Sequence, residues 1–416
     1  MRDGRDNSLG IYVSIPFCRS KCTYCNFASG VYPASGHGPY VDRLIQDLAS
    51  AGTWAAQMGA ELPRRVDTVY LGGGTPSVLA PDLLATLFGA IGSEFDLEPN
   101  AEITVECAPG QLADKTLAAL VAAGVNRVSL GVQSFIDSEA HASGRLHGRA
   151  IVLDDLRRLR AAGITNLNVD LIAGLAGQTF DSWRESLEVL VGSGVPHASV
   201  YMLEVDEDSR LGRELLAGGA RYRAGLVPSD DTIARMYGMA IERLGRAGPG
   251  AGIDQYEISN FCRPGFVSRH NLRYWQRRSY LGVGLDASSM LWESSKGIKR
   301  AEARHLLRAT TTDDLGAFLE GSLQPETAWL SPISQHEEAW FLGLRLNGGV
   351  DVAALEHEFG REMVAPAIEV VERLVKTGLL TFVAGLVRLT AEGRLLSNDV
   401  FQEFLGLAPE RELAGR

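Results

Sequence analysis

Short apolar runs alternate with longer stretches of helical spacing through the first half of the chain. The apolar runs have the composition of buried strands, and between them apolar residues recur three and four positions apart. The predicted strands are residues 10–17, 66–74, 101–107, 125–133, 165–175 and 197–203. The predicted helices are residues 40–57, 81–95, 114–125, 150–164 and 180–195. This alternation predicts an α/β fold in which crossover helices join parallel strands.

The periodicity does not fix how the predicted sheet closes. An open doubly wound sheet and a curved or closed barrel both satisfy six strand–helix alternations. In both arrangements ligands bind beyond the carboxyl ends of the strands. A functional site is therefore expected at those ends.

The pattern of apolar residues changes after about residue 300, where they recur mainly three and four positions apart, as in helices. Residues 332–360 and 366–380 read as helices, and residues 379–390 read as a short hairpin followed by one more helix. This order predicts a small C-terminal helical domain of winged-helix type, with an all-helical packing domain as the alternative. We expect two domains, residues 1–295 and 296–416.

Composition narrows the class of protein. The chain has 416 residues and a formal net charge of −11. The negative charge argues against a nucleic-acid partner, since binding to phosphates needs a sustained positive field. The sequence contains no run of about 18 apolar residues that would span a membrane. We predict a soluble, cytoplasmic protein, for which peripheral contact with a membrane and any oligomeric state stay open.

Three of the five cysteines, Cys18, Cys22 and Cys25, lie within eight residues. An odd and sparse set of cysteines argues against a disulfide framework. A structural zinc site needs four ligands, and the second cysteine pair is missing. An iron–sulfur cluster held by three cysteines would leave one iron open to a small molecule. This third interpretation explains the missing fourth cysteine.

Polar residues and glycines stand at successive strand ends. The second predicted strand ends in the glycine turn 72–76, where the absence of Cβ atoms lets the backbone approach a ligand closely. Glu106, Gln133 and Asp170 end the third, fourth and fifth strands. A lone carboxylate at a strand end is usually a helix cap or an ion-pair partner. Three polar groups at neighbouring ends, all beyond the cysteines, favour a binding site.

Together these residues resemble the radical S-adenosylmethionine (radical SAM) superfamily, whose C-x-x-x-C-x-x-C motif is matched by Cys18, Cys22 and Cys25. The resemblance implies a 4Fe-4S cluster on the three cysteines, with S-adenosylmethionine chelating the open iron. It also implies that an electron from the cluster splits the sulfonium to give methionine and a 5′-deoxyadenosyl radical.

Further motifs resemble one group of that superfamily, the oxygen-independent coproporphyrinogen III oxidases and their relatives, the HemW heme chaperones. The matching segments are IYVSIPFC, YLGGGTPS, GVQSF, NVDLIAGLAGQT, QYEISNF and RHNLRYWQRRSYLGVG. The resemblance covers nearly the whole chain and implies a partial (β/α)6 barrel followed by a small helical domain.

One position separates the two functions within this group. The oxidases carry a fourth cysteine two residues after the third, whereas here Cys25 is followed by Asn26 and Phe27. This form resembles the chaperones, and it implies binding of heme as cargo and its delivery to heme-accepting proteins such as respiratory hemoproteins. The alternative is an enzyme of porphyrin biosynthesis that oxidatively decarboxylates porphyrinogen propionates.

The resemblance also implies cofactor contacts. The residues that match the family's contacts are Tyr12, Tyr24, Gly73, Gly74, Thr75, Glu106, Gln133, Arg145 and Asp170. Carboxylates and backbone groups can receive the methionine ammonium and the ribose hydroxyls, and an arginine can pair a carboxylate. Arg149 is a neighbouring candidate for the role of Arg145. Cys107 and Cys262 are expected to stay outside the cluster.

A heme contact is implied at His270, within the segment His270, Asn271, Tyr274 and Trp275 that matches H-N-x-x-Y-W. A neutral imidazole can ligate heme iron, and aromatic rings can stack on a porphyrin. Arg269 or Arg273 is expected to pair a heme propionate. The alternative is a hydrogen-bonded structural histidine.

Two segments depart from the family pattern. Residues 284–290 carry Asp286 and Ser288 where relatives commonly have a histidine, which leaves open any heme or substrate role for this loop. Glu106 is followed by Cys107 and Ala108 where an Ala-Asn pair is usual, and this change is expected to alter packing only.

Overall fold

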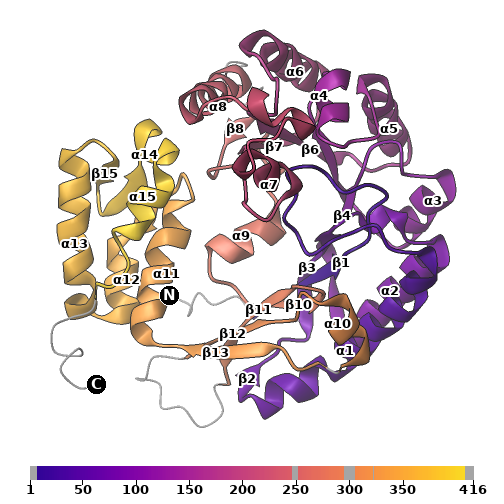
Figure 1. The fold of residues 1–416 in the computed structure, drawn as a ribbon. Helices are drawn as coiled ribbons and strands as arrows, with labels where there is room; N and C mark the ends of the chain where they lie inside the picture. Colours follow the sequence, from indigo (N-terminus) through magenta and orange to yellow (C-terminus); the bar gives the residue numbers. More distant parts are fainter. Residues whose placement is uncertain (1–6, 246–251, 295–304, 322, 408–416) are drawn as a thin grey trace.

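Six parallel strands, neighbours in chain order, form the centre of the fold (Figure 1). The structure is a computed structural model, and it describes residues 7–245, 252–294, 305–321 and 323–407. The parallel strands are β1 (Leu9–Ile15), β3 (Arg65–Gly73), β4 (Asp96–Cys107), β5 (Arg127–Gln133), β6 (Asn166–Ala173) and β7 (His197–Met202). All six coincide with predicted strands, so the α/β prediction is confirmed.

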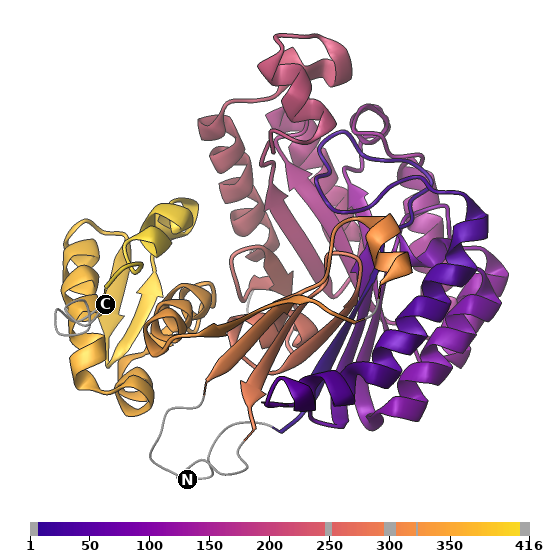
Figure 2. The ribbon, with the colours of Figure 1, turned by 60° about the horizontal axis from the view of Figure 1, so that its bottom comes forward.

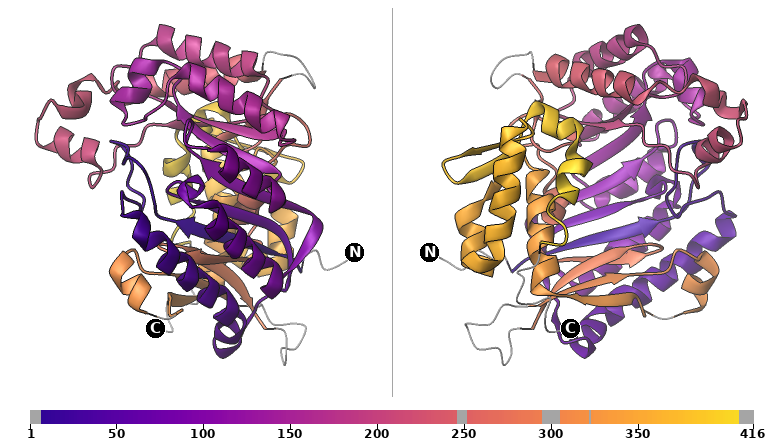
Figure 3. Two further views of the ribbon diagram at one scale, coloured as in Figure 1. Left: turned by 90° about the vertical axis from the view of Figure 1, so that its right-hand side faces the viewer. Right: turned by 60° about the vertical axis from the view of Figure 1, so that its left-hand side comes forward.

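Helices cover the outer face of the curved sheet, as Figures 1 and 2 show. They are α1 (His37–Gln57), α2 (Pro81–Glu94), α3 (Asp114–Ala122), α4 (Asp137–Ala142), α5 (Arg149–Ala161), α6 (Phe180–Ser193) and α8 (Asp230–Gly245). In the left panel of Figure 3 several of these helices lie in front of the strands. Strand side chains alternate, so one set, such as Ile11, Val69 and Val105, packs under the helices in the main core, and the other set faces the inside of the curve.

Further strands extend both edges of the sheet. After β7 the chain adds the antiparallel strands β9 (Asn260–Cys262) and β8 (Asp254–Gln255). On the other edge β10 (Tyr280–Gly284) pairs parallel with β1, and it is followed by β11 (Ser288–Glu293), β12 (Leu306–Thr310) and β13 (Glu326–Leu330), while β2 (Ala60–Glu61) pairs with β11. Among the described residues, the outermost strands β8 and β13 do not pair with each other. The sheet is therefore a partial barrel, which settles the choice that periodicity left open.

Short helical elements connect these strands. They are the 3-10 turns η1 (Ala34–Gly36), η2 (Pro76–Val78) and η3 (Arg221–Leu226), and the helices α7 (Arg210–Leu216), α9 (Arg269–Trp275) and α10 (Leu315–Glu320). No helix of the described residues is both long and apolar enough to cross a membrane.

A second core lies in the C-terminal part of the chain. It is built by α11 (Pro332–Leu344), α12 (Val352–Phe359), α13 (Arg361–Lys376), the small sheet β14 (Val350–Asp351), β15 (Leu380–Val383) and β16 (Leu386–Leu389), and the helices α14 (Ala391–Leu395) and α15 (Ser397–Gln402). Trp340 stacks on Phe404 at its centre, with 4.8 Å between the rings. The predicted helices and hairpin are present, so the winged-helix-like order of elements is observed. The predicted domain boundary at residues 295 and 296 lies outside the described residues and stays a prediction.

Helix α9 joins the two cores. It packs on β3 of the large sheet and on α11 of the second core. The guanidinium of Arg345, which follows α11, lies 4.2 Å from the ring centre of Trp275 on α9. The right panel of Figure 3 shows the C-terminal helices beside the strands of the barrel.

Candidate functional site

The loop that follows β1 carries the three clustered cysteines and is anchored on several sides. The amide of Cys18 donates to the carbonyl of Gly30, 2.8 Å away. Lys21 Nζ donates to the carbonyls of Phe27 and Ser29, each at 2.7 Å, and so closes the loop on itself. The amide of Thr23 donates to Ser143 of the α4–α5 connection. A loop that carries three thiols is thus held over the carboxyl end of the sheet.

The three thiols face one cavity and have few polar neighbours. Cys18 Sγ lies 3.8 Å from Thr75 Oγ1, and Cys25 Sγ lies 4.0 Å from Ser29 Oγ. Burial raises the pKa of the Cys18 thiol, and a bound metal cation would offset this cost by pairing with the thiolate. Across the described residues, no group of three His, Cys, Asp or Glu side chains stands ready-made in metal-binding geometry. The donor set therefore has the right chemistry for a cluster, but the loop must draw its thiols together to hold one.

Below the loop, a cavity of about 520 Å³ opens at the carboxyl ends of the parallel strands. Its walls include all three cysteines and eight of the predicted cofactor contacts. Those eight are Tyr24, Gly73, Gly74, Thr75, Glu106, Gln133, Arg145 and Asp170. The ninth, Tyr12, does not line the cavity, and its ring packs beside those of Tyr70, 6.1 Å away, and His270, 6.4 Å away.

The glycine turn after β3 explains why this wall of the cavity is backbone. Gly73 has a φ of 97°, which disfavours a side chain. A Cβ on Gly74 would lie 2.8 Å from the carbonyl oxygen of Ile15 and 2.9 Å from that of Phe17. The turn can therefore pack under the cysteine loop only if it has no side chains at these positions.

Two carboxylates, Glu106 on β4 and Asp170 on β6, lie buried in the cavity wall. Burial, helped by the nearby charge of Asp170, raises the pKa of Glu106 to about 7. Tyr70 donates its hydroxyl hydrogen to Glu106 Oε1 at 2.8 Å. Asp170 accepts from Ser129 at 3.0 Å and from Asn168 at 2.7 Å, and burial raises its pKa too. A cationic or hydroxyl-bearing ligand would satisfy both carboxylates.

Two buried polar atoms in the cavity wall lack a hydrogen-bond partner. Arg145 donates to the hydroxyl of Tyr24 at 3.1 Å, but its Nε has no hydrogen-bond partner. The Oε1 atom of Gln133 is also buried without a partner. Arg149, the alternative to Arg145, lies outside the cavity and pairs with Glu185. These atoms and the three thiols fit a cluster with a polar zwitterion beside it.

The other cysteines lie apart from the thiol loop. Cys107 borders the cavity and Cys262 is buried on β9. Burial raises the pKa of Cys107 to about 12 and that of Cys262 to about 11, so both are neutral thiols. Residues 284–290, which depart from the family pattern, contribute no side chain to the cavity lining.

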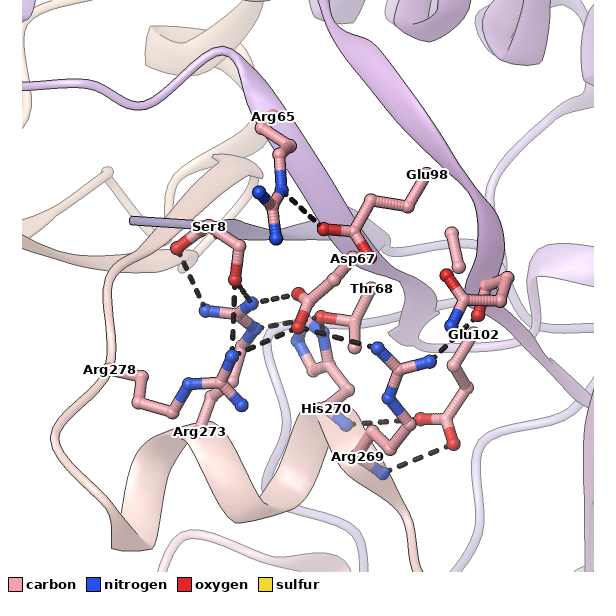
Figure 4. A network of polar contacts seen from close by, with 12 residues as sticks. Ser8, Arg65, Asp67, Thr68, Glu98, Glu102, Arg269, His270, Arg273 and Arg278 are labelled. Carbon is pink, nitrogen blue, oxygen red and sulfur yellow. Dashed lines mark hydrogen bonds and ion pairs between the residues drawn. The ribbon is translucent and has the colours of Figure 1, made fainter. Parts of the chain in front are cut away.

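His270 occupies a buried position on α9, with 0% exposure (Figure 4). Its Nδ1 lies 2.9 Å from Thr68 Oγ1, and its Nε2 lies 2.9 Å from the hydroxyl of Tyr274. Burial lowers the pKa of His270 to about 3, so the ring is neutral. Ligation of iron would require one of these hydrogen bonds to break and the ring to become accessible. The heme role of His270 stays a prediction.

The expectation that Arg273 is available for a heme propionate is wrong. Arg273 is completely buried and pairs with Asp67, and it also donates to Thr68, Ser8 and the Ser279 carbonyl (Figure 4). A guanidinium held in this way is structural. Arg269 is more exposed and makes a longer contact of 3.4 Å with Asp67.

Several residues that line the cavity were not predicted from the sequence to do so. They are Tyr70, Arg127, Ser129, Asn168, Ser199, Tyr201 and Asn271. All except Asn271 lie on the parallel strands, in register with the inward side of the curve. The alternation of side chains along a strand, counted back from Glu106, Gln133 and Asp170, is the signal that would have found most of them.

Comparisons with known proteins agree with this geometry. The family described as the radical SAM superfamily matches residues 12–190, and the HemN C-terminal domain matches residues 330–396. The protein named heme chaperone HemW of Lactococcus lactis is 35% identical over 399 residues, which cover 95% of this chain and 96% of that protein. The heme chaperone HemW of Escherichia coli is 28% identical over 400 residues, covering 95% and 98%.

A solved structure supports the fold independently. It is the coproporphyrinogen III oxidase HemN from Escherichia coli, described as a radical SAM enzyme. The two chains superimpose with a TM-score of 0.78 at 21% identity, over 97% of this chain and 92% of that one. At this identity the likeness concerns the fold alone, and the predicted partial barrel with a C-terminal domain is confirmed.

Proposed function

Since this chain belongs to the radical SAM superfamily and, within it, to the family of HemW heme chaperones, we propose that it binds heme and delivers it to hemoproteins. The observation that carries the proposal is the side chain of Phe27. It is 64% exposed beside the cysteine loop, at the position where the resembling oxidases carry a fourth cysteine. Respiratory hemoproteins as acceptors and a cytoplasmic location are part of this proposal.

Cys18, Cys22 and Cys25 are the proposed ligands of a 4Fe-4S cluster. Their thiols border one cavity, and no fourth cysteine is close in sequence. When bound, such a cluster supplies an electron to a sulfonium ligand. The protein's own part is to fix the thiol loop through Lys21 and to keep the cavity below it polar.

The cavity below the thiols is the proposed site for S-adenosylmethionine. Arg145, Gln133 and the glycine turn can hold the methionine end, because two of these groups carry unpartnered buried atoms. Glu106 and Asp170 can accept hydrogen bonds from an ammonium or from ribose hydroxyls. Tyr12 belongs to the proposed set only through contacts made by Tyr70, which lies between it and Glu106.

Heme ligation by His270 is retained as a proposal with a structural condition. The imidazole ring must give up its hydrogen bond to Thr68 or to Tyr274. The guanidinium of Arg345 covers a face of Trp275, so that face is not free to stack on a porphyrin. Oxidative decarboxylation of coproporphyrinogen III is the alternative function.

The test uses the full chain, reconstituted anaerobically with iron and sulfide. Heme should bind and then transfer to the apo form of a respiratory hemoprotein, while coproporphyrinogen III should not be turned over. His270→Ala should alter the Soret band, and Gln276→Ala, at the exposed C-cap of the same helix and outside the cavity lining, is the matched control that should leave iron ligation in place. Many turnovers of coproporphyrinogen III per cluster would establish the oxidase instead. An unchanged Soret band in the folded His270→Ala protein would remove His270 as the ligand.

A further inference from the structure

Arg127 is a buried cation that feels the charge of Asp170 but makes no direct hydrogen bond or ion pair with it. It is 1% exposed and borders the cavity from the first residue of β5. Within the part of the chain that the structure describes, no hydrogen bond or ion pair reaches its guanidinium, and its Nε is buried and unsatisfied. Leaving a guanidinium buried and unpaired is costly, so such a group points to a missing anion.

The nearby carboxylates are already occupied by other donors. Glu102 accepts the backbone amides of Arg269 and His270, at 3.1 and 3.0 Å. Asp170 accepts from Ser129 and Asn168, and Glu106 accepts from Tyr70. No described carboxylate therefore neutralises Arg127 through a direct contact.

The residues around Arg127 form a polar floor. Thr104 is its neighbour in the register of β4 and β5, and the Oγ1 atom of Thr104 is likewise buried without a partner. Asn271, at the start of α9, lines the same cavity with an amide side chain. A guanidinium fork beside a hydroxyl and an amide is the donor set that receives a carboxylate.

This floor is separate from the proposed contact for the methionine end. The guanidinium of Arg145 lies against Gly131 of β5, because a Cβ at Gly131 would be 3.0 Å from Arg145 Nη2. Arg127 lies four residues before Gly131 on the same strand, which corresponds to about 13 Å along β5. Arg127 therefore starts from a deeper level of the strand than the one that Arg145 contacts.

We propose that Arg127, with Thr104 and Asn271, forms a second anion subsite that binds a carboxylate on a flexible aliphatic arm, as the propionates of a tetrapyrrole provide. The inference rests on the proposed function, since it takes heme as the molecule whose propionate binds here. The arm enters the barrel while the macrocycle stays toward the mouth, where the exposed Phe27 offers an apolar contact. The subsite selects tetrapyrroles by their free acid groups.

The experiment compares heme with its dimethyl ester, which lacks both carboxylates. The reconstituted wild type, Arg127→Gln, Arg127→Lys and the control Arg160→Gln are titrated by Soret absorbance. Arg160 is a control from the surface, where it donates to the carbonyl of Ser193. Binding of S-adenosylmethionine is measured by calorimetry on the same proteins, and circular dichroism reports folding.

Esterification should weaken binding to the wild type and to Arg160→Gln by about 10- to 100-fold, the contribution of one charge-assisted pair. Arg127→Gln should lose the same factor for heme and show no further loss with the diester. Arg127→Lys should give an intermediate loss because it keeps the charge without the fork. Affinity for S-adenosylmethionine should stay within about twofold in all variants.

Other outcomes overturn the proposal in distinguishable ways. An equal penalty for esterification in the wild type and Arg127→Gln refutes the subsite but leaves heme binding intact. Loss of S-adenosylmethionine affinity in Arg127→Gln, with the ester penalty unchanged, assigns the arginine to the methionine carboxylate. A wild type that binds neither heme nor its diester refutes the chaperone function together with the subsite. If Arg127→Gln does not fold, an ester penalty in Arg127→Lys equal to that of the wild type also refutes it.

Discussion

The affinity for S-adenosylmethionine should depend on pH through Glu106. Burial, together with the charge of Asp170, raises the pKa of this carboxyl to about 7 from its ordinary value near 4.5. Glu106 is a proposed hydrogen-bond acceptor for the ammonium or the ribose hydroxyls of the ligand. Its carboxylate accepts these hydrogen bonds best when it is ionised. Below pH 7 the ligand must therefore displace a proton from Glu106 before it binds.

The size of the effect follows from the fraction that is ionised. With a pKa of about 7, roughly one tenth of the carboxyls are ionised at pH 6 and roughly nine tenths at pH 8. The dissociation constant should therefore fall by about tenfold between these pH values, which is about 1.4 kcal/mol of binding free energy. In Glu106→Gln the affinity should be lower throughout and this slope should vanish.

The assay is calorimetry on anaerobically reconstituted protein, at pH 6 and pH 8, in buffers with different enthalpies of ionisation. Buffers that differ in this way reveal the proton that leaves Glu106. Glu257→Gln is the matched control, because burial also raises the pKa of Glu257 but this residue does not border the cavity. A pH slope that persists in Glu106→Gln would refute the placement of the ligand against this carboxylate.

Stability of the ligand-free protein gives an independent check of the same pKa. A carboxyl whose pKa is raised in the folded state binds its proton more tightly there than in the unfolded chain. Its contribution to stability is therefore lost as pH rises from about 4.5 to 7, by about 3 kcal/mol in total. Glu106→Gln should remove this loss from the pH dependence of urea unfolding relative to the wild type.

The thiol assignment predicts that Cys22→Ala abolishes the reconstituted cluster, while Cys262→Ala keeps its iron content. Iron and sulfide analysis decides between them, and full occupancy in Cys22→Ala would contradict the site. The network under α9 predicts that Asp67→Asn costs about 3 to 5 kcal/mol of unfolding free energy, because it removes the carboxylate charge that pairs with the buried Arg273. Glu98→Gln, which only breaks a pair with the exposed Arg65, should cost less than about 1 kcal/mol by the same denaturant measurement, and equal losses would contradict this ranking.

Local pattern was enough to predict the parallel strands, their crossover helices and the wall of the cavity. Strand ends in a parallel sheet meet at one edge, so Glu106, Gln133 and Asp170 could be brought together without knowing the curvature. The spacing of the cysteines, which lie on one short loop, also needed no long-range information. These features depend on neighbours in sequence or on the order of strands alone.

The floor of the cavity depends on contacts that sequence pattern does not encode. Asn271 reaches the cavity only because α9 packs across β3, about 200 positions away in sequence. Arg127 begins its strand and looks like an ordinary surface cation there, since charged residues often flank strands. Whether such a residue faces inward is decided by the register of β4 and β5.

The aromatic segment on α9 has a structural explanation that does not involve iron. His270 bridges Thr68 of β3 and Tyr274, Glu102 of β4 caps the amides at the start of the helix, and Trp275 lies under Arg345 of the second core. A helix fixed at both ends transmits any displacement at one core to the other, because packed interiors yield little. If a ligand in the cavity pulls on Asn271, either α9 and the second core must move together or the hydrogen bond between His270 and Thr68 must break. Ligation of heme iron by His270, as proposed, therefore requires α9 to shift relative to at least one of the two cores or to give up a hydrogen bond of the imidazole.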